Sequence, residues 1–482
     1  MSQGVQKLVL LHTNDLHSHL EQMTRIASYC KQKRSEVGND QLLTLEIGDH
    51  MDRMSPETDG TAGKVNVEVM NATGYDAAVL GNNEGLTFTP AILRECYYNQ
   101  ANFPIIGSNI REVESGRIPD WMEPYVIIQK GPLRIGLIGV TAAYQTFYAE
   151  LGWNATDPLE AVLTYVRELR QQVDVIIVMS HLGYGFDERM AKEISGIDLI
   201  LGGHTHHVIT EPHVFGNTHV CAAGKFGQYI GEVEIEYIAE HDAVSIVSIN
   251  GRLIETDELP ADEEVSGILK NNADQANLVL SQEIVHLEED LALNWYEESP
   301  LGNLLASGLR KWTSAEIGIV NAGQLLSGLS KGKVTRGNLL EICPGPINPC
   351  IYSLFGYELR EALEQSLMTE FTYKEIRGFG FRGEVLGSLC IDGLTVEYDL
   401  KRQPMDRIIR IGIHNGNFEE ERQYRVGTID MFTFGVGYLS LSKGTNIKYM
   451  LPEFLRDILS YQLQDTTEIQ LAKRKRWIQS SS

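Results

Sequence analysis

Five short apolar runs in the first half of the chain each end close to a charged or amide residue. The runs cover residues 7–11, 42–47, 77–80, 173–179 and 199–201. Continuous runs of about four to eight apolar residues predict strands that are buried on both faces. Patterns typical of helices separate them, over residues 24–33, 64–73, 90–99 and 158–172. This alternation predicts an α/β domain built on a central, buried sheet.

The residues that follow the five runs have side chains that bind metal ions. They are Asp15, His17, Asp49, Asn82, His181, His204 and His206. Because ligands in α/β sheets bind beyond the carboxyl ends of the strands, we expect these side chains to gather at one rim. Carboxylate, carboxamide and imidazole groups suit Zn, Mn, Fe or Co, and the absence of cysteine argues against a structural zinc site. Seven ligands exceed the needs of one tetrahedral ion, so the pattern predicts two divalent ions that share Asp49.

Length and charge narrow the choice of partners. At 482 residues the chain predicts two or three domains. The formal net charge of -24 argues against a partner that is a nucleic acid polymer. It is compatible with a small phosphorylated substrate, because bound divalent ions supply local positive charge. The sequence offers no clue to the oligomeric state.

The sequence has no pattern typical of a membrane span or of a signal peptide. No apolar run approaches the roughly 20 residues of a membrane span, and no pattern of a signal peptide stands at the start. Six scattered cysteines without a C-x-x-C pair are expected to be thiols. These features predict a cytoplasmic protein with no membrane partner.

A change of pattern divides the chain. Residues 1–258 carry the strand–helix alternation and form the predicted catalytic domain. Residues 259–282 are polar and have the pattern of a connecting helix. Residues 283–482 contain more glycine and strands of antiparallel type, such as 394–398, and form the predicted second domain.

The blocks at the strand ends resemble a known family. D-L-H at 15–17, G-D at 48–49, G-N-N-E at 81–84, S-H-L-G at 180–183 and G-H-T-H at 203–206 are similar to the calcineurin-like metallophosphoesterases. The stretches 298–306 and 319–323 resemble the second domain of its two-domain 5′-nucleotidase group. That group includes UDP-sugar hydrolases and 2′,3′-cyclic-nucleotide 2′-phosphodiesterases.

The resemblance implies a fold and a ligand set. The fold is of α/β (α+β) class, with a four-layer metallophosphoesterase β-sandwich flanked by helices and a second α/β domain, the 5′-nucleotidase C-terminal domain, which binds substrate. One ion is assigned to Asp15, His17, Asp49 and His206. The other ion is assigned to Asp49, Asn82, His181 and His204.

The third block departs from the group's pattern. The group has Gly-Asn-His-Glu-Phe-Asp, in which the histidine contacts the phosphate and the aspartate orients it, whereas this chain has Asn83 and Leu86 there. A donor of this kind is worth roughly 10² to 10³ in rate at comparable sites. The candidate replacements are His50 and Arg53, which closely follow Asp49, and Asn82 is a further candidate for placing the phosphate.

The second domain departs as well. Leu326 stands where the group has a phosphate-side arginine, and Val436 replaces the aspartate expected to bind the ribose. Aromatic side chains that could stack on a base and arginines that could bind an anion lie nearby. The candidate substrate-binding residues are Asn321, Arg377, Phe379, Arg382, Phe432 and Phe434.

Together these features predict a phosphohydrolase with a dinuclear metal centre. Its expected substrate is a small phosphoester, nominally a nucleotide or a 2′,3′-cyclic nucleotide. Leu326 and Val436 favour an alternative, a hydrolase of another phosphorylated or pyrophosphate metabolite. Asn83 and Leu86 favour a second, a metal- and phosphate-binding protein with weakened catalysis.

Overall fold

A computed structural model describes residues 4–240, 243–413 and 416–480. It divides into two compact units, Met1–Ala276 and Asn277–Ser482. The division falls inside helix α9 (Glu263–Leu280), which lies within the range expected for the connecting helix. No helix among the described residues is both long and apolar enough to cross a bilayer.

The first unit is built on two main sheets. The larger has the strand order β15-β14-β1-β2-β3-β4-β6, and the smaller has the order β12-β13-β11-β10-β8-β7. The strands of the larger sheet are β1 (Gln6–Thr13), β2 (Leu42–Glu46), β3 (Ala77–Val79), β4 (Ile105–Ile106), β6 (Met122–Glu123), β14 (Tyr229–Glu240) and β15 (Ala243–Glu255). Those of the smaller are β7 (Val126–Lys130), β8 (Leu133–Thr141), β10 (Val175–His181), β11 (Leu199–Gly202), β12 (His213–Phe215) and β13 (Thr218–Ala222). A separate pair joins β5 (Ile110–Glu112) to β9 (Trp153–Ala155).

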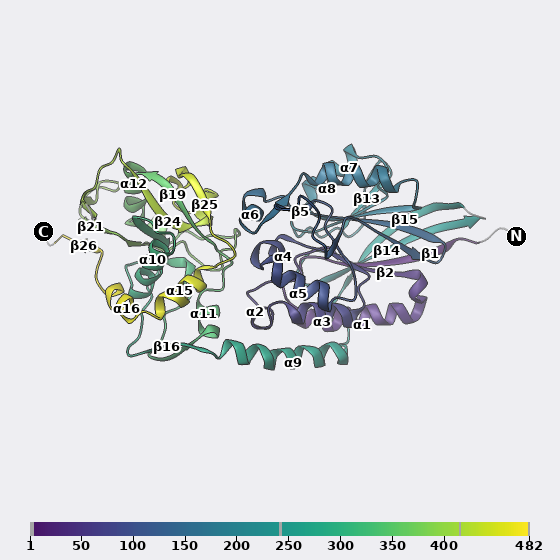
Figure 1. Ribbon diagram of the computed structural model, residues 1–482, viewed down its shortest axis with the longest axis horizontal. Helices are drawn as coiled ribbons and strands as arrows, with labels where there is room; N and C mark the ends of the chain where they lie inside the picture. Colours follow the sequence, from purple (N-terminus) through teal and green to yellow (C-terminus); the bar gives the residue numbers. More distant parts are fainter. Residues whose placement is uncertain (1–3, 241–242, 414–415, 481–482) are drawn as a thin grey trace. The chain divides into compact units, whose positions relative to one another are not determined.

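Alternation along the strands explains the layers. In β1, Leu8 and Leu10 pack against the inner face of the smaller sheet. Val9 and Leu11 point the other way, toward α1 (Leu20–Val37), α3 (Lys64–Thr73) and α5 (Pro90–Gln100). The outer face of the smaller sheet packs against α7 (Pro158–Leu169) and α8 (Tyr184–Glu193), as Figure 1 shows. The predicted four-layer sandwich is therefore confirmed, and each sheet is apolar on both faces because each has a covered outer side.

The remaining helices of the first unit are short: α2 (Pro56–Gly60), α4 (Asn82–Thr87) and α6 (Gln145–Glu150). Helix α5 begins where the sequence predicts, with Pro90 in its first turn and the Thr89 hydroxyl accepting a hydrogen bond from the Ile92 amide. Helix α1 starts at Leu20, earlier than the predicted residue 24. A capping side chain is the usual sequence signal for the start of a helix, and the first turn of α1 has none.

The described part of the second unit contains three sheets. A five-stranded sheet has the order β20-β17-β24-β19-β25, a four-stranded sheet has the order β23-β22-β21-β26, and β16 pairs with β18. Its strands are β16 (Glu283–Leu287), β17 (Ile317–Asn321), β18 (Gly332–Thr335), β19 (Pro349–Phe355), β20 (Leu389–Asp392), β21 (Leu394–Tyr398), β22 (Ile408–Ile413), β23 (Gly416–Asn417), β24 (Gln423–Ile429), β25 (Thr445–Tyr449) and β26 (Trp477–Gln479). Its helices are α10 (Pro300–Trp312), α11 (Arg336–Ile342), α12 (Gly356–Ser366), α13 (Thr369–Thr372), α14 (Asp430–Thr433), α15 (Leu455–Leu463) and α16 (Thr466–Ala472).

The strand predicted over residues 394–398 is observed as β21. It pairs antiparallel with β22, as expected, and parallel with β26 at the end of the chain. All six cysteines are buried and free, in agreement with the expectation of thiols.

Candidate metal centre

The predicted ligands follow strands of both sheets of the first unit. Asp15 and His17 follow β1, Asp49 follows β2, and Asn82 opens helix α4 after β3. In the smaller sheet, His181 is the last residue of β10, and His204 and His206 follow β11. The sequence indicated one rim of a single sheet, whereas the structure brings the carboxyl ends of strands from two stacked sheets together.

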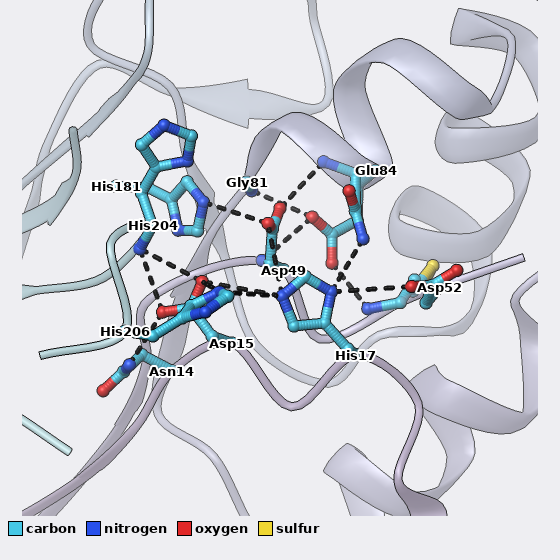
Figure 2. Close-up of polar contacts among 12 residues, drawn as sticks. Asn14, Asp15, His17, Asp49, Asp52, Gly81, Glu84, His181, His204 and His206 are labelled. Atoms are coloured by element: carbon cyan, nitrogen blue, oxygen red, sulfur yellow. Dashed lines mark hydrogen bonds and ion pairs between the residues drawn. The ribbon is translucent and has the colours of Figure 1, made fainter. Parts of the chain in front are cut away.

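The first group of ligands consists of Asp15, His17 and His206. Each offers one ligand atom, and these atoms all lie within 4.8 Å of one another. The Nε2 atoms of His17 and His206 are 3.2 Å apart, and Nε2 of His206 is 3.4 Å from Oδ1 of Asp15. Figure 2 shows the two rings next to one another beside the Asp15 carboxylate, and the angle between their planes is 84°. One carboxylate oxygen and two imidazole nitrogens suit a borderline divalent ion.

The second group consists of Asp49, His181 and His204, again with ligand atoms within 4.8 Å of one another. Oδ2 of Asp49 lies 3.3 Å from Nε2 of His181 and 3.8 Å from Nε2 of His17. The same carboxylate oxygen therefore faces both groups, as a bridging ligand must. Oδ1 of Asn82 is buried and has no hydrogen-bond partner among the described residues, which fits a role as a ligand.

Hydrogen bonds to other parts of the protein hold several ligands in position. Nδ1 of His181 is 2.8 Å from the carbonyl oxygen of Ile47, so Nδ1 carries the proton and Nε2 keeps its lone pair for an ion. The His204 backbone amide donates to both oxygens of Asp15, at 3.0 and 2.9 Å. The Asn83 backbone amide donates to Oδ1 of Asp49 at 2.8 Å, which leaves Oδ2 for the two ligand groups.

His17 is oriented from its other nitrogen. Nδ1 of His17 lies 2.8 Å from the side-chain amide of Asn83 and 3.6 Å from Oδ2 of Asp52. A carboxylate that accepts the Nδ1 proton, as Asp52 can, fixes the ring of a ligating histidine and raises its basicity, whereas the Asn83 amide nitrogen is itself a donor. Asn83 thus contacts a ligand in this chain, at the position where the family's phosphate-binding histidine was expected.

Glu84 holds the Asp49 loop to helix α4. Its buried carboxylate accepts hydrogen bonds from the amides of Asp49, Met51 and Gly81, at 3.1, 2.7 and 2.9 Å. Gly81 itself lies so close to Asp49 that any Cβ there would overlap the Asp49 carboxylate. Figure 2 shows Glu84 and Gly81 on the far side of Asp49 from Asp15.

The backbone of this site is unusual. Five of the predicted ligands adopt left-handed φ angles that favour glycine. These are Asp15 (52°), His17 (47°), Asp49 (55°), His204 (72°) and His206 (57°). The left-handed conformation costs a non-glycine residue roughly 1–2 kcal/mol. Such costs gather at functional sites, where geometry matters more than stability.

The electrostatics of Asp49 and His181 favour a cation. Burial opposes ionisation of Asp49, yet the neighbouring His181 outweighs it and holds the pKa of that carboxyl well below its usual range. Burial alone would lower the pKa of His181, but the Asp49 charge raises it. The site therefore stabilises positive charge beside Asp49, and a divalent ion can replace the proton of His181. With the ligand set described above, the residues present fit two divalent ions.

Comparison with known proteins agrees with this geometry. The family described as calcineurin-like phosphoesterase matches residues 8–208, and the 5′-nucleotidase C-terminal domain matches residues 281–440. The uncharacterized metallophosphoesterase YunD of Bacillus subtilis (strain 168) is 37% identical over 465 residues, which cover 95% of this chain and 99% of that protein. The chain belongs to the 5′-nucleotidase family.

More distant relatives extend the comparison. A snake venom 5′-nucleotidase of Gloydius brevicauda is 26% identical over 518 residues, covering 94% of this chain and 81% of that protein. The NAD nucleotidase of Haemophilus influenzae has a structure that covers 100% of this chain and 98% of its own, with a TM-score of 0.67 and 16% identity. That structural likeness shows the two-domain fold of the family.

Two predicted phosphate donors of this 5′-nucleotidase family member, His50 and Arg53, contact other residues of the protein. His50 is buried, its Nδ1 lies 3.1 Å from the side-chain amide of Asn66, and burial lowers its pKa to about 3. Arg53 donates from Nε to Asp59 at 2.8 Å and from Nη1 to the Thr87 carbonyl at 2.9 Å. Their role as replacement donors stays a prediction, and these contacts favour a structural role for both.

The predicted aromatic residues fall into two classes. Phe379 and Phe434 are exposed, at 57% and 44%, and their rings are stacked with centroids 6.0 Å apart and an angle of 25°. Phe432 is fully buried and belongs to the core of its unit. An exposed stacked pair can bind the planar ring of a ligand, whereas a core phenylalanine cannot.

The polar candidates of the second unit also differ. Asn321 is fully buried, donates to the Leu386 carbonyl at 2.6 Å and accepts from Gln324 at 3.0 Å, so both ends of its amide are engaged. Arg377 is highly exposed and contacts Glu375 at 3.4 Å, and Arg382 donates to the Phe381 carbonyl at 3.4 Å. Of these residues, Arg377 is the one most accessible to an anion.

Sequence reasoning missed several residues of the metal centre. Asp52, Glu84 and Tyr144 contact ligands or their loops, and none was singled out. Tyr144 follows strand β8 much as the ligands follow theirs, and its hydroxyl is 3.1 Å from Nε2 of His204. The position of Tyr144 after a predicted strand was therefore the signal that could have identified it. Tyrosine is not a typical metal ligand, so the search for ligands passed over it.

Proposed function

We propose that this chain is a metal-dependent phosphohydrolase that cleaves a small phosphoester, most simply a nucleotide. The observation that supports it most is the carboxylate of Asp49 facing two separate groups of ligands. Bound divalent ions such as Zn, Mn, Fe or Co supply an activated water and neutralise the phosphoryl charge in enzymes of this kind.

The chain's own residues hold and orient the centre in this proposal. Asp15, His17 and His206 would hold one ion, and Asp49, His181 and His204 would hold the other. Asn82 would complete the second group with its side-chain oxygen, which has no partner among the described residues. The hydrogen bond from His181 to Ile47 keeps the ligating nitrogen aimed at Asp49, so little rearrangement is needed when the ions bind.

The C-terminal unit is proposed to recognise the nucleoside. Phe379 and Phe434 form the exposed aromatic pair, and a base can insert by stacking against one or both rings. Stacking of a base on an aromatic side chain is worth about 1–3 kcal/mol. Arg377, exposed two residues before Phe379, is a candidate for an anionic group of the substrate.

A substrate panel tests the proposal. The purified chain, loaded with Mn²⁺, is offered p-nitrophenyl phosphate, nucleoside 5′-monophosphates, 2′,3′-cyclic nucleotides, sugar phosphates and pyrophosphates. We expect hydrolysis of the aryl phosphate and of at least one nucleotide class. The variant Asp49→Asn should lose activity by a factor on the order of 10² or more, since a charged group central to the site is removed.

Asp40→Asn is the matched control, because Asp40 is an exposed carboxylate of the same unit. It should keep the activity of the wild type. Hydrolysis confined to non-nucleotide phosphates would replace the nucleotide assignment with another phosphorylated metabolite. Failure to hydrolyse any member of the panel, with metal bound, would overturn the proposed function.

A further inference from the structure

Tyr144 is an exposed tyrosine at the edge of the metal centre. It follows β8 and precedes helix α6, and its side chain is 40% exposed. Its hydroxyl lies 3.1 Å from Nε2 of His204, and the two rings have centroids 6.1 Å apart. Among the described residues, His204 is the only hydrogen-bond partner of this hydroxyl. The side chain therefore reaches a ligand of the second group while remaining open to a substrate.

The chemistry of a ligating histidine determines how Tyr144 can act. A neutral imidazole binds an ion through one nitrogen and carries its proton on the other. Since Nε2 of His204 faces the Tyr144 oxygen, Nε2 is the nitrogen that carries the proton, and Nδ1 is left for the ion. The hydroxyl of Tyr144 then accepts a hydrogen bond from His204. Its own proton has no acceptor in the described structure and can be donated to a bound group.

The other candidate donors near the ions are engaged elsewhere. The side-chain amide of Asn83 lies 2.8 Å from Nδ1 of His17. His50 contacts Asn66 through Nδ1, and its Nε2, which has no partner among the described residues, is buried and closed to a substrate, while Arg53 pairs with Asp59 and the Thr87 carbonyl. These contacts fix each side chain to the protein. Tyr144 alone among the donors discussed combines exposure with direct contact to a ligand.

We propose that Tyr144 donates a hydrogen bond from its hydroxyl to the phosphoryl group of the substrate. It is a catalytic residue that supplies the donor absent at Asn83. This inference rests on the proposed function only in that the bound group is a phosphoester. A donor placed at this point stabilises charge on the phosphoryl oxygens, and His204 holds its oxygen in position.

The experiment compares Tyr144→Phe with the matched control Tyr184→Phe. Tyr184 also has its hydroxyl next to a histidine, at 2.7 Å from Nδ1 of His213, but His213 belongs to neither ligand group. Three quantities are measured for each protein: Mn²⁺ binding by calorimetry, orthovanadate binding to the Mn²⁺-loaded protein, and kcat/KM for p-nitrophenyl phosphate. Orthovanadate serves as an anion with the shape and charge of phosphate.

Tyr144→Phe should bind orthovanadate about tenfold more weakly and lose about 10² in kcat/KM, as expected for one lost donor to developing charge. Its affinity for Mn²⁺ should fall by no more than about 10- to 100-fold, the cost of removing the partner of a ligating histidine, so orthovanadate binding and turnover are compared at saturating Mn²⁺. Tyr184→Phe should match the wild type in all three. Unchanged orthovanadate binding in Tyr144→Phe would overturn the proposal. A loss of orthovanadate binding that is fully explained by weaker Mn²⁺ binding would overturn it too, because Tyr144 would then be a positioning residue for His204.

The two proposals can fail separately. If the wild type hydrolyses no phosphoester, the proposed function falls, but the orthovanadate comparison still tests the hydrogen bond from Tyr144. If the wild type is active and Tyr144→Phe equals it in anion affinity and turnover, the role of Tyr144 falls while the phosphohydrolase assignment stands.

Discussion

The Nε2 atoms of His17 and His206 lie 3.2 Å apart, although 189 positions separate the two residues along the chain. Two imidazole lone pairs at this distance repel one another unless a proton or a cation lies near both. Oδ1 of Asp15 is 3.8 Å from the first nitrogen and 3.4 Å from the second, so negative charge is also concentrated there. A divalent ion relieves all three interactions at once.

The first prediction concerns metal stoichiometry and stability. Wild type should bind two Mn²⁺ ions per chain, and His206→Ala should bind one, because the first group loses a nitrogen ligand. Saturation at about 100 times the dissociation constant should stabilise the folded state by about 2.7 kcal/mol per site. Metal analysis and thermal unfolding with and without chelator measure both effects. His207→Ala is the control, because its Nδ1 contacts Thr205 outside the ligand groups. Two ions retained by His206→Ala would contradict the assignment.

A second prediction follows from the contact between Asp52 and His17. Asp52→Ala removes the carboxylate that lies 3.6 Å from Nδ1 of His17 and should weaken binding of one of the two ions by about 10- to 100-fold, as for other lost partners of ligating histidines. Calorimetric titration with Mn²⁺ measures it. Asn99→Ala, on the exposed face of α5, should leave both affinities unchanged. Equal affinities in Asp52→Ala and wild type would show that the Asp52 carboxylate does not orient the ring.

The third prediction separates the aromatic residues of the C-terminal unit. Phe379→Ala and Phe434→Ala should raise KM for a nucleotide by about 5- to 100-fold, in line with about 1–3 kcal/mol per stacked base. KM for p-nitrophenyl phosphate should change less, since it has no base. Phe432→Ala should instead lower the free energy of unfolding by about 3–5 kcal/mol, because it empties a buried site. Equal effects on both substrates would argue against base stacking.

The fourth prediction uses the buried carboxyl of Asp430. Burial raises its pKa to about 7, although the Asn348 amide donates to Oδ2 at 3.2 Å, and Oδ1 has no partner among the described residues. Because this pKa lies above 3.8, the ordinary value of an aspartate, the folded state binds the proton more tightly than the unfolded state. The resulting stability is complete below about pH 4 and is lost as the pH rises toward about 7.

Asp430→Asn removes this dependence. Relative to wild type, the variant should become more stable by up to about 1.4 kcal/mol for each pH unit within that window. Melting temperatures of both proteins across the window give the difference. Glu370→Gln, at an exposed carboxyl on α13, is the control. A constant difference between Asp430→Asn and wild type would show that Asp430 ionises alike in the folded and unfolded chains.

The strand ends of the metallophosphoesterase domain were predictable because their signal is local. An apolar run that ends next to Asp49 or His181 predicts both the strand and the ligand at its carboxyl end. Contacts between residues far apart in the sequence decide which of the two sheets each strand joins. The sequence pattern does not predict this, because an apolar run has the same appearance in either sheet. The four-layer arrangement came from the family resemblance and is confirmed by the packing of Leu8 and Val9 on opposite faces of β1.

The finer parts of the site escaped the sequence for a different reason. Phe379 and Phe432 are the same residue type in similar glycine-rich surroundings, and burial alone distinguishes them. Tyr144 is 60 positions from His204, so no spacing within one motif connects them. The burial of a phenylalanine and the contact between Tyr144 and His204 depend on tertiary packing, which the local sequence does not reveal.

Gly81 limits how this metal centre can change through mutation. A methyl group at that position would occupy the space of the Asp49 carboxylate, whereas a side chain added at Gly185 in α8 would meet nothing within 4 Å. Larger side chains can therefore accumulate at the exposed position 185, while position 81 remains glycine. The constraint is steric, so it applies whichever ion or phosphoester a descendant of this sequence comes to use.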